Sequence, residues 1–237
     1  ERVGKHLIAF GETPLPIEFE PSTLKTIGIF DYDDNLKKAK IWESAHMKRD
    51  PADGALYNFY IDYGRKSAYV IYKIEDNTTS RKLLTRHEVS EPSYMHDFSI
   101  TENYVILTAY PLVVDPIDLL NPKYSFIGAH RWEPSRLTTV YVFDKKTGNF
   151  ISEINTQAMF AFHHINAFEG KDGLINLYLS ASDNADLVVK VGETETKYGH
   201  VQLQKMVIDL NKSSIDIICL SKESYELPSI KENLVGR

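Results

Sequence analysis

Short alternations of apolar and polar residues, separated by turn residues, repeat along the whole chain. The segments with this pattern are rich in β-branched and aromatic side chains, which favour strands. They lie at 7–10, 17–19, 26–32, 56–61, 67–74, 105–107, 139–143, 150–154, 162–169, 174–179, 201–209 and 215–219. No stretch shows the 3.6-residue period of a long amphipathic helix. The sequence therefore predicts an all-β protein.

The predicted strands occur in pairs at regular spacing, which is typical of a β-propeller or a β-sandwich. The strands at 139–143 and 150–154, for example, flank a turn with Gly148 near its tip, as expected for a hairpin. About a dozen strands correspond to roughly three to four propeller blades. Three to four blades form an open arc and not a closed ring, and an open arc would leave sheet edges exposed. We therefore expect residues 1–237 to be the central portion of a single propeller domain, with the first and last blades outside this sequence.

Composition narrows the class of protein. The net charge is −6 and there is no long run of Lys and Arg, which argues against a nucleic-acid-binding surface. Cys219 is the only cysteine, which excludes an intrachain disulfide and a cysteine-based metal site. A reducing, cytoplasmic location is expected from this cysteine usage. No stretch approaches the 18 apolar residues that a membrane-spanning helix needs.

Three histidines lie in apolar or aromatic surroundings close to predicted strands. His46 precedes a turn and an aromatic strand, His96 leads into the strand at 105–107, and His163 lies inside the apolar run at 162–169. They are separated by 50 and 67 residues, while a propeller blade takes roughly 40–50 residues. Histidines from successive blades could therefore converge on the central axis. Neutral imidazole is the commonest metal ligand, although a single buried histidine is more often an ordinary core residue.

His163 is followed directly by His164. Neighbouring side chains on a strand point to opposite faces. Only one of these two histidines can therefore face a given metal site.

Three motifs resemble those of the carotenoid cleavage oxygenase family. They are Ala45-His46 with Asp50-Pro51, Met95-His96-Asp97-Phe98 with Ile100-Thr101-Glu102-Asn103, and Phe162-His163 with Asn166-Ala167 and Glu169. The family includes plant, bacterial and archaeal carotenoid and apocarotenoid dioxygenases and the vertebrate retinoid isomerase. The resemblance extends across nearly the whole chain. The first motif departs from the family pattern, because Ser44 and Met47 replace the usual Thr and Pro.

The resemblance implies a seven-bladed β-propeller with Fe2+ on its axis, held by four histidines. By motif, His46, His96 and His163 are the first three ligands, and His164 points away from the metal. The fourth ligand lies near the C-terminus of family members and has no counterpart in this sequence.

Two glutamates match outer-shell positions of the same family. They are Glu12 in Ala-Phe-Gly-Glu-Thr and Glu226 in Tyr-Glu-Leu-Pro-Ser-Ile. A carboxylate that accepts a hydrogen bond from the far ring N–H holds an imidazole in one tautomer. It also compensates the charge that neutral ligands leave on the metal.

The implied activity is Fe2+-dependent cleavage of a double bond of a carotenoid or apocarotenoid by O2. The products are aldehydes or ketones of the apocarotenal or retinal type. One alternative is a retinoid isomerohydrolase on the same fold, and another is a non-catalytic propeller that binds partners through a histidine-containing core. A zinc hydrolase is disfavoured, because the sequence has no H-E-x-x-H motif.

The segment from residue 109 to residue 127 breaks the strand rhythm with three prolines and many large apolar side chains. It is either a loop packed over a blade or a partly exposed patch that meets a membrane or a lipophilic ligand. Because carotenoids are insoluble in water, we expect peripheral contact with a membrane. The candidate substrate or membrane residues are Phe98, Leu112, Leu119, Leu120 and Phe126.

Overall fold

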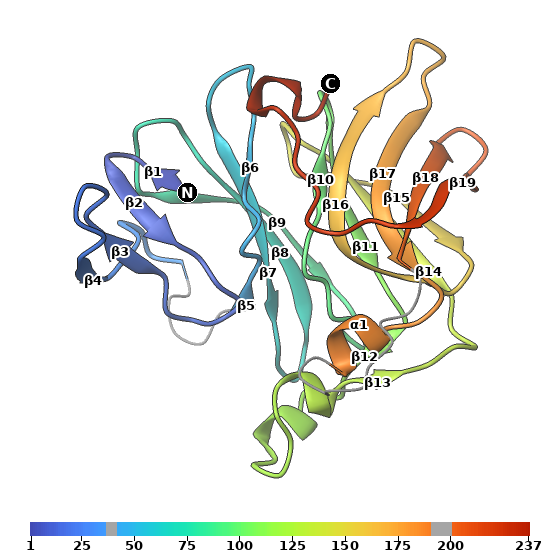
Figure 1. Ribbon diagram of the computed structural model, residues 1–237, viewed down its shortest axis with the longest axis horizontal. Coiled ribbons are helices and arrows are strands. Elements are labelled where there is room, and N and C mark those ends of the chain that lie inside the picture. Colours follow the sequence, from blue (N-terminus) through green and yellow to red (C-terminus); the bar gives the residue numbers. More distant parts are fainter. Residues whose placement is uncertain (37–41, 191–200) are drawn as a thin grey trace.

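A computed structural model describes residues 1–36, 42–190 and 201–237. In this part of the chain the strands form four sheets of four or five strands and one two-stranded pair. Each of the four sheets is an antiparallel meander of strands that are close in sequence, which is the organisation of a propeller blade. Figure 1 shows the sheets following one another from β1–β4 (blue) to β16–β19 (orange to red). The all-β class and the blade-like repeats predicted from the sequence are therefore confirmed.

The first sheet contains β1 (Arg2–Val3), β2 (His6–Ala9), β3 (Ile17–Phe19) and β4 (Thr26–Ile29). The second contains β5 (Trp42–Glu43), β6 (Lys48–Arg49), β7 (Leu56–Asp62), β8 (Ala68–Ile74) and β9 (Arg81–Glu88). The third contains β10 (Ser99–Ile100), β11 (Tyr104–Ala109), β14 (Thr138–Asp144) and β15 (Phe150–Thr156). The fourth contains β16 (Phe160–Glu169), β17 (Ile175–Ser182), β18 (Gln202–Asp209) and β19 (Ser214–Ser224).

The remaining short elements lie between strands of the third or fourth sheet, or follow the last strand. They are the pair β12 (Leu112–Val113) and β13 (Arg131–Trp132), the 3-10 turns η1 (Asp118–Leu120), η2 (Ile127–Ala129) and η3 (Glu232–Leu234), and the helix α1 (Asp186–Val189). Among the described residues, no helix is long and apolar enough to cross a membrane.

The hydrophobic core lies between neighbouring sheets in three clusters. Strand β7 shows how the two-residue alternation divides one strand between two clusters. Its residues Tyr57, Phe59 and Ile61 pack in the cluster shared with β10 and β11, on the side of the third sheet. Leu56 and Tyr60 pack in the cluster shared with β1 and β2, on the side of the first sheet. The second sheet is thus packed against a neighbouring sheet on each of its two faces.

Two of the predicted patch residues belong to this core. Phe98 has 0% exposure and its ring packs edge-on against Phe59, 5.3 Å away between centroids. Leu112 also has 0% exposure, because β12 pairs with β13 and packs in the cluster between the third and fourth sheets. Phe98 and Leu112 therefore do not form an exposed membrane patch, while their predicted contact with a substrate stays a prediction. An apolar run has the same appearance in a short buried strand as in an exposed loop.

The turn between β14 and β15 packs directly on the second sheet. Gly148 in this turn has φ +76°, and a Cβ atom built on it would overlap the backbone carbonyl of Leu84 in β9. Gly173, in the turn between β16 and β17, has φ +79° but open space around it. The two glycines share the left-handed conformation that side chains oppose, while only Gly148 also has a close backbone neighbour.

We expect Gly148→Ala to lower the free energy of unfolding by about 2–3 kcal/mol, since strain and a backbone clash add together. Gly173→Ala serves as the matched control and should cost only about 1 kcal/mol of conformational strain. Urea unfolding of the two variants measures the difference. Equal losses of stability would show that the turn does not pack on β9 as described.

Candidate metal centre

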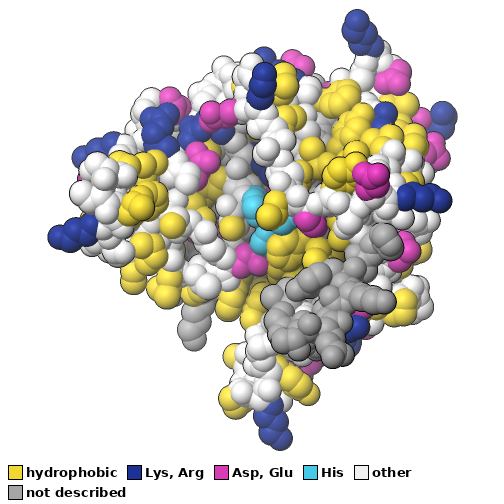
Figure 2. All heavy atoms as spheres, in the orientation of Figure 1, with side chains coloured by type: hydrophobic (Ala, Val, Ile, Leu, Met, Phe, Trp, Pro, Cys, Tyr) yellow, Lys and Arg dark blue, Asp and Glu magenta, His cyan; other side chains and the backbone are white. Residues whose placement is uncertain are grey.

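The three histidines predicted as ligands come from the innermost segments of three successive sheets. His46 lies between β5 and β6, which pair with the two ends of β7. His96 lies just before β10, and His163 lies within β16. Figure 2 shows histidine side chains at the centre of one face of the molecule, in a hollow between the lobes on either side.

The three imidazoles converge on one point. One ring nitrogen from each lies within 4.8 Å of the others, and the Nε2 atoms of His46 and His96 are 2.8 Å apart. The ring of His46 makes angles of 64° with that of His96 and 84° with that of His163. In the described part of the chain, no other group of His, Cys, Asp or Glu side chains forms a comparable cluster.

Two carboxylates fix the orientation of two of these rings. Nδ1 of His96 lies 3.0 Å from Oε2 of Glu12, and Nδ1 of His163 lies 2.6 Å from Oε2 of Glu226. An ionised carboxylate can only accept hydrogen bonds, so each Nδ1 carries the proton. The unprotonated Nε2 atom of each ring is then free to bind a metal. The structure thus places Glu12 behind the ring of His96 and Glu226 behind the ring of His163.

Glu12 and Glu226 reach the centre from loops. Glu12 lies between β2 and β3, and its Oε2 also accepts a hydrogen bond from the Tyr94 hydroxyl at 2.7 Å. Glu226 lies in the segment after β19, and its Oε2 also accepts the backbone N–H of Leu227 at 3.0 Å. Both carboxylates are therefore held in place by a second donor. No pattern in the sequence pointed to Tyr94 as a partner of Glu12.

His46 is held as a neutral ring. Burial lowers its pKa to about 4, and Asp97 opposes this shift while His96 and Lys48 reinforce it. At neutral pH the imidazole of His46 is therefore uncharged, which is the form that binds metals.

A distortion in β16 separates His163 from His164. The register between β16 and β17 shifts between Ala161 and His164 and again between His164 and Asn166. Bulges of this kind re-aim side chains. The ring of His164 turns away from the histidine cluster, with Nδ1 3.0 Å from the Ser99 hydroxyl and Nε2 3.0 Å from the Tyr110 hydroxyl.

Ser44 links two of the ligand segments. Its hydroxyl donates to the carbonyl oxygen of His96 at 2.6 Å and accepts the backbone N–H of His46 at 3.1 Å. The amide of Asn58 donates to the Ser44 carbonyl at 2.9 Å. The sequence showed Ser44 only as a departure from the family pattern. Its role follows from the structure, because it depends on a contact across 52 residues.

The donor set fits a divalent transition metal. Imidazole nitrogen suits Zn, Cu, Fe and Ni. Two nitrogens each about 2.1 Å from one metal and at a right angle lie about 3 Å apart, close to the 2.8 Å between the Nε2 atoms of His46 and His96. His46, His96 and His163 would hold the ion, while Glu12 and Glu226 would balance its charge.

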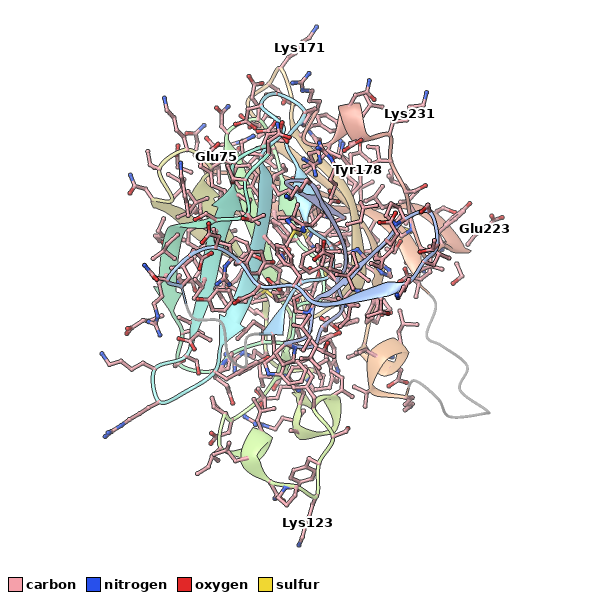
Figure 3. All side chains as sticks on the ribbon, turned by 90° about the vertical axis from the view of Figure 1, so that its left-hand side faces the viewer. Glu75, Lys123, Lys171, Tyr178, Glu223 and Lys231 are labelled. Carbon is pink, nitrogen blue, oxygen red and sulfur yellow. The ribbon has the colours of Figure 1, made fainter. Side chains whose placement is uncertain are left out.

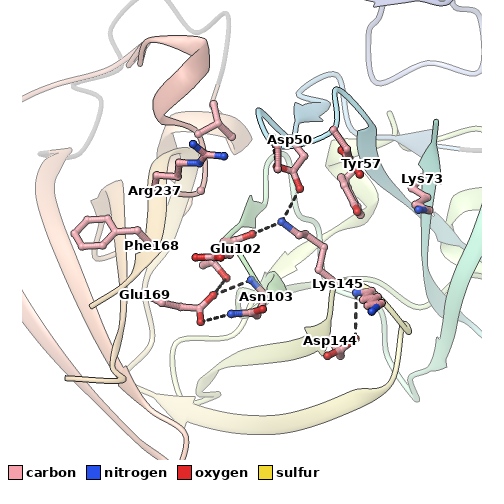
Figure 4. A pocket seen from close by; sticks show the side chains of 16 residues that line it. Asp50, Tyr57, Lys73, Glu102, Asn103, Asp144, Lys145, Phe168, Glu169 and Arg237 are labelled. Carbon is pink, nitrogen blue, oxygen red and sulfur yellow. Dashed lines mark hydrogen bonds and ion pairs between the residues drawn. The ribbon is translucent and has the colours of Figure 1, made fainter. Parts of the chain in front are cut away.

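A separate cavity of about 990 Å³ contains none of these histidines. Figure 4 shows its charged lining, including the ion pair between Lys145 and Asp50 at 2.7 Å and the hydrogen bonds from Asn103 to Glu169. Such a lining does not suit an apolar polyene.

The sequence profile of the family described as retinal pigment epithelial membrane protein (RPE65) matches residues 2–237. The chain belongs to this family. Its relatives include the carotenoid 9,10(9',10')-cleavage dioxygenase 1 of Pisum sativum, which is 28% identical over 232 residues, 96% of this chain and 41% of the relative. The isoeugenol monooxygenase of Pseudomonas nitroreducens is 31% identical over 165 residues, 69% of this chain and 33% of the relative.

Solved structures of the family share the fold. Cobalt-substituted apocarotenoid oxygenase (ACO) of Synechocystis matches all of this chain and 51% of its own, with a TM-score of 0.84 and 26% sequence identity. The chain thus spans about half the length of this structure and less of the curated relatives.

We expect Glu226→Gln to weaken metal binding and turnover about 10–100-fold, because the amide leaves His163 without a charged hydrogen-bond acceptor. Iron content after dialysis against a chelator measures the effect in the full-length protein. Glu223→Gln, an exposed position on β19, is the matched control and should retain iron. Wild-type iron content and turnover in the Glu226→Gln variant would restrict Glu226 to a structural role.

Proposed function

We propose that this chain carries most of the metal centre of an Fe2+-dependent dioxygenase that cleaves a double bond of a carotenoid or apocarotenoid. The observation that carries the proposal is the cluster of His46, His96 and His163, with carboxylates behind two of the rings. The carotenoid dioxygenases among the relatives support the substrate class, and the match to the pea enzyme covers almost the whole chain.

Bound Fe2+ would supply the one-electron chemistry that lets O2 react with an electron-rich double bond. Both oxygen atoms enter the products, so R–CH=CH–R′ and O2 give R–CHO and R′–CHO. No external reductant is needed for this balance. Among the residues described, none is assigned as a general base, and the protein's part is to bind and orient.

Aromatic side chains beside His96 provide an apolar wall. Phe162 stacks on the imidazole of His96 with 3.8 Å between ring centroids. Phe126 stacks on Trp42 at 4.0 Å and lies 6.4 Å from Tyr94. Such surfaces exclude water and favour flat conjugated chains. We therefore propose that Phe126, predicted from the sequence, together with Phe162 and Tyr94, lines the path of the substrate.

The retinoid isomerohydrolase stays an alternative, because the matching family profile is named after a retinal pigment epithelial protein. An isomerohydrolase would consume a retinoid ester without O2 and would release a carboxylic acid. A metal-free binding propeller would show no stoichiometric iron. Oxygen uptake therefore distinguishes the dioxygenase from the isomerohydrolase, and bound iron distinguishes both enzymes from the binding propeller.

We expect the iron-loaded full-length protein to convert at least one carotenoid or apocarotenal under 18O2 into two carbonyl fragments, each with one 18O atom. Mass spectrometry performed promptly after quenching limits exchange of carbonyl oxygen with water. Isoeugenol belongs in the same panel, since one relative is named for it. Ester cleavage without O2 uptake would favour the isomerohydrolase. A protein that binds no iron would contradict both the dioxygenase and the isomerohydrolase hypotheses.

The segment around η1 carries the exposed part of the predicted apolar patch. Ile117, Leu120 and Tyr124 are 68%, 82% and 52% exposed. Figure 3 places Lys123 in this segment at one tip of the molecule, at the opposite end from Lys171 in the turn between β16 and β17. We propose that this tip, residues 117–124, meets a membrane that delivers the substrate.

We expect replacement of both Leu119 and Leu120 by Ser to weaken liposome binding, because each buried Leu contributes about 1.5–3 kcal/mol. The apparent KM for a bilayer-delivered polyene should rise about tenfold, while iron content stays unchanged. A matched control replaces Leu83 and Leu137, which are 49% and 51% exposed elsewhere on the surface. Normal liposome binding by the Leu119 and Leu120 variant would contradict the proposal.

A further inference from the structure

An ion pair between a partly buried lysine and a buried aspartate lies among the segments that carry the three histidines. Nζ of Lys48 is 2.7 Å from Oδ1 of Asp97, and the two side chains are 18% and 2% exposed. Lys48 follows His46 by two residues, and Asp97 follows His96 directly. The pair therefore connects the first two ligand segments through their side chains.

The same carboxylate reaches the third ligand segment. Oδ2 of Asp97 accepts the backbone N–H of His164 at 2.9 Å, directly after His163. Oδ1 also accepts the backbone N–H of Phe98 at 2.7 Å. One side chain thus holds contacts to the segments of all three candidate ligands.

The position of β16 explains why this contact matters. It is the innermost strand of its sheet, so one of its edges has no neighbouring strand within that sheet. The N–H of His164 is buried there and needs an acceptor, because an unsatisfied buried N–H is costly. The pairing with β17 is also irregular around His164. The backbone hydrogen bonds between β16 and β17 therefore do not by themselves determine the position of His163.

We propose that Lys48 and Asp97 form a positioning pair, which sets the relative placement of His46, His96 and His163 and thereby the affinity and geometry of the metal site. The inference rests on the proposed metal centre. Neither residue is placed among the ligands or against the substrate.

Charge and positioning predict opposite effects for one substitution. The Lys48 ammonium is a positive charge near a site for a cation, so its removal should tighten metal binding if only charge matters. If the pair positions the ligands, Lys48→Met should weaken metal binding, because Asp97 loses the partner that ties it to the segment of His46. The sign of the change therefore separates the two explanations.

Co2+ is a suitable probe, because it gives visible absorption bands that depend on ligand geometry and a relative has been solved in cobalt-substituted form. The full-length protein is compared with Lys48→Met, with Asp97→Asn and with the double variant. Lys145→Met is the matched control. It removes the ammonium of another buried Lys–Asp pair, in which Lys145 lies 2.7 Å from Asp50 with side chains 10% and 9% exposed, at the charged cavity of Figure 4.

We expect Lys48→Met to weaken Co2+ binding about 10-fold in competition with a chelator and to shift the absorption bands. The effects of the two single variants should not add in the double variant. The double variant leaves no unpaired buried charge, so it should fold even where a single variant does not. It should still show weakened Co2+ binding and shifted bands, whereas Lys145→Met should match the wild type in both.

Co2+ affinity at or above the wild-type level in Lys48→Met, with unchanged bands, would overturn the positioning role, as would a double variant that binds like the wild type. In both cases the proposed metal centre would stand. A wild-type protein that binds neither Fe2+ nor Co2+ would overturn the metal centre and the positioning pair together.

Discussion

The candidate centre depends on one constraint, which is that the inner segments of three neighbouring sheets meet at a common point. The hydrophobic clusters between the sheets fix each sheet against the next. The packing of the sheets largely determines the positions of the segments that contain His46, His96 and His163. Histidines separated by 117 residues in sequence can therefore converge. The remaining freedom lies in the short, irregular inner strands, where β5, β6 and β10 have two residues each.

Polar contacts remove that remaining freedom. Ser44 joins the backbones of His46 and His96, and Asp97 joins the segments of His96 and His163. Buried polar networks of this kind contribute little net stability, since desolvation offsets much of their attraction. They do specify one arrangement, because a displaced member would leave a buried group without its partner. We infer that the contacts of Ser44 and Asp97 serve mainly to place the three histidines and add little to the stability of the fold.

The sequence predicted the features that depend on local pattern. Strand alternation and turn residues identified most strands, and the motifs around His46, His96 and His163 identified the cluster. Strand β9 was missed, because its sequence Arg-Lys-Leu-Leu-Thr-Arg-His-Glu is largely polar on a solvent-facing outer strand. The burial of Phe98 and Leu112 and the pairing of Lys48 with Asp97 were also missed. These features depend on which segments meet in space, and local pattern carries no information about that.

The charges around the histidines have a simple balance. Three neutral imidazoles leave the two positive charges of a divalent ion uncompensated at the ligands themselves. Glu12 and Glu226 supply two negative charges one hydrogen bond farther out. Asp97 would add a third, but Lys48 cancels it at 2.7 Å. The surroundings therefore match a 2+ ion without a directly bound carboxylate. Because Glu12 and Glu226 lie behind the rings, neither carboxylate occupies the space in front of the three Nε2 atoms.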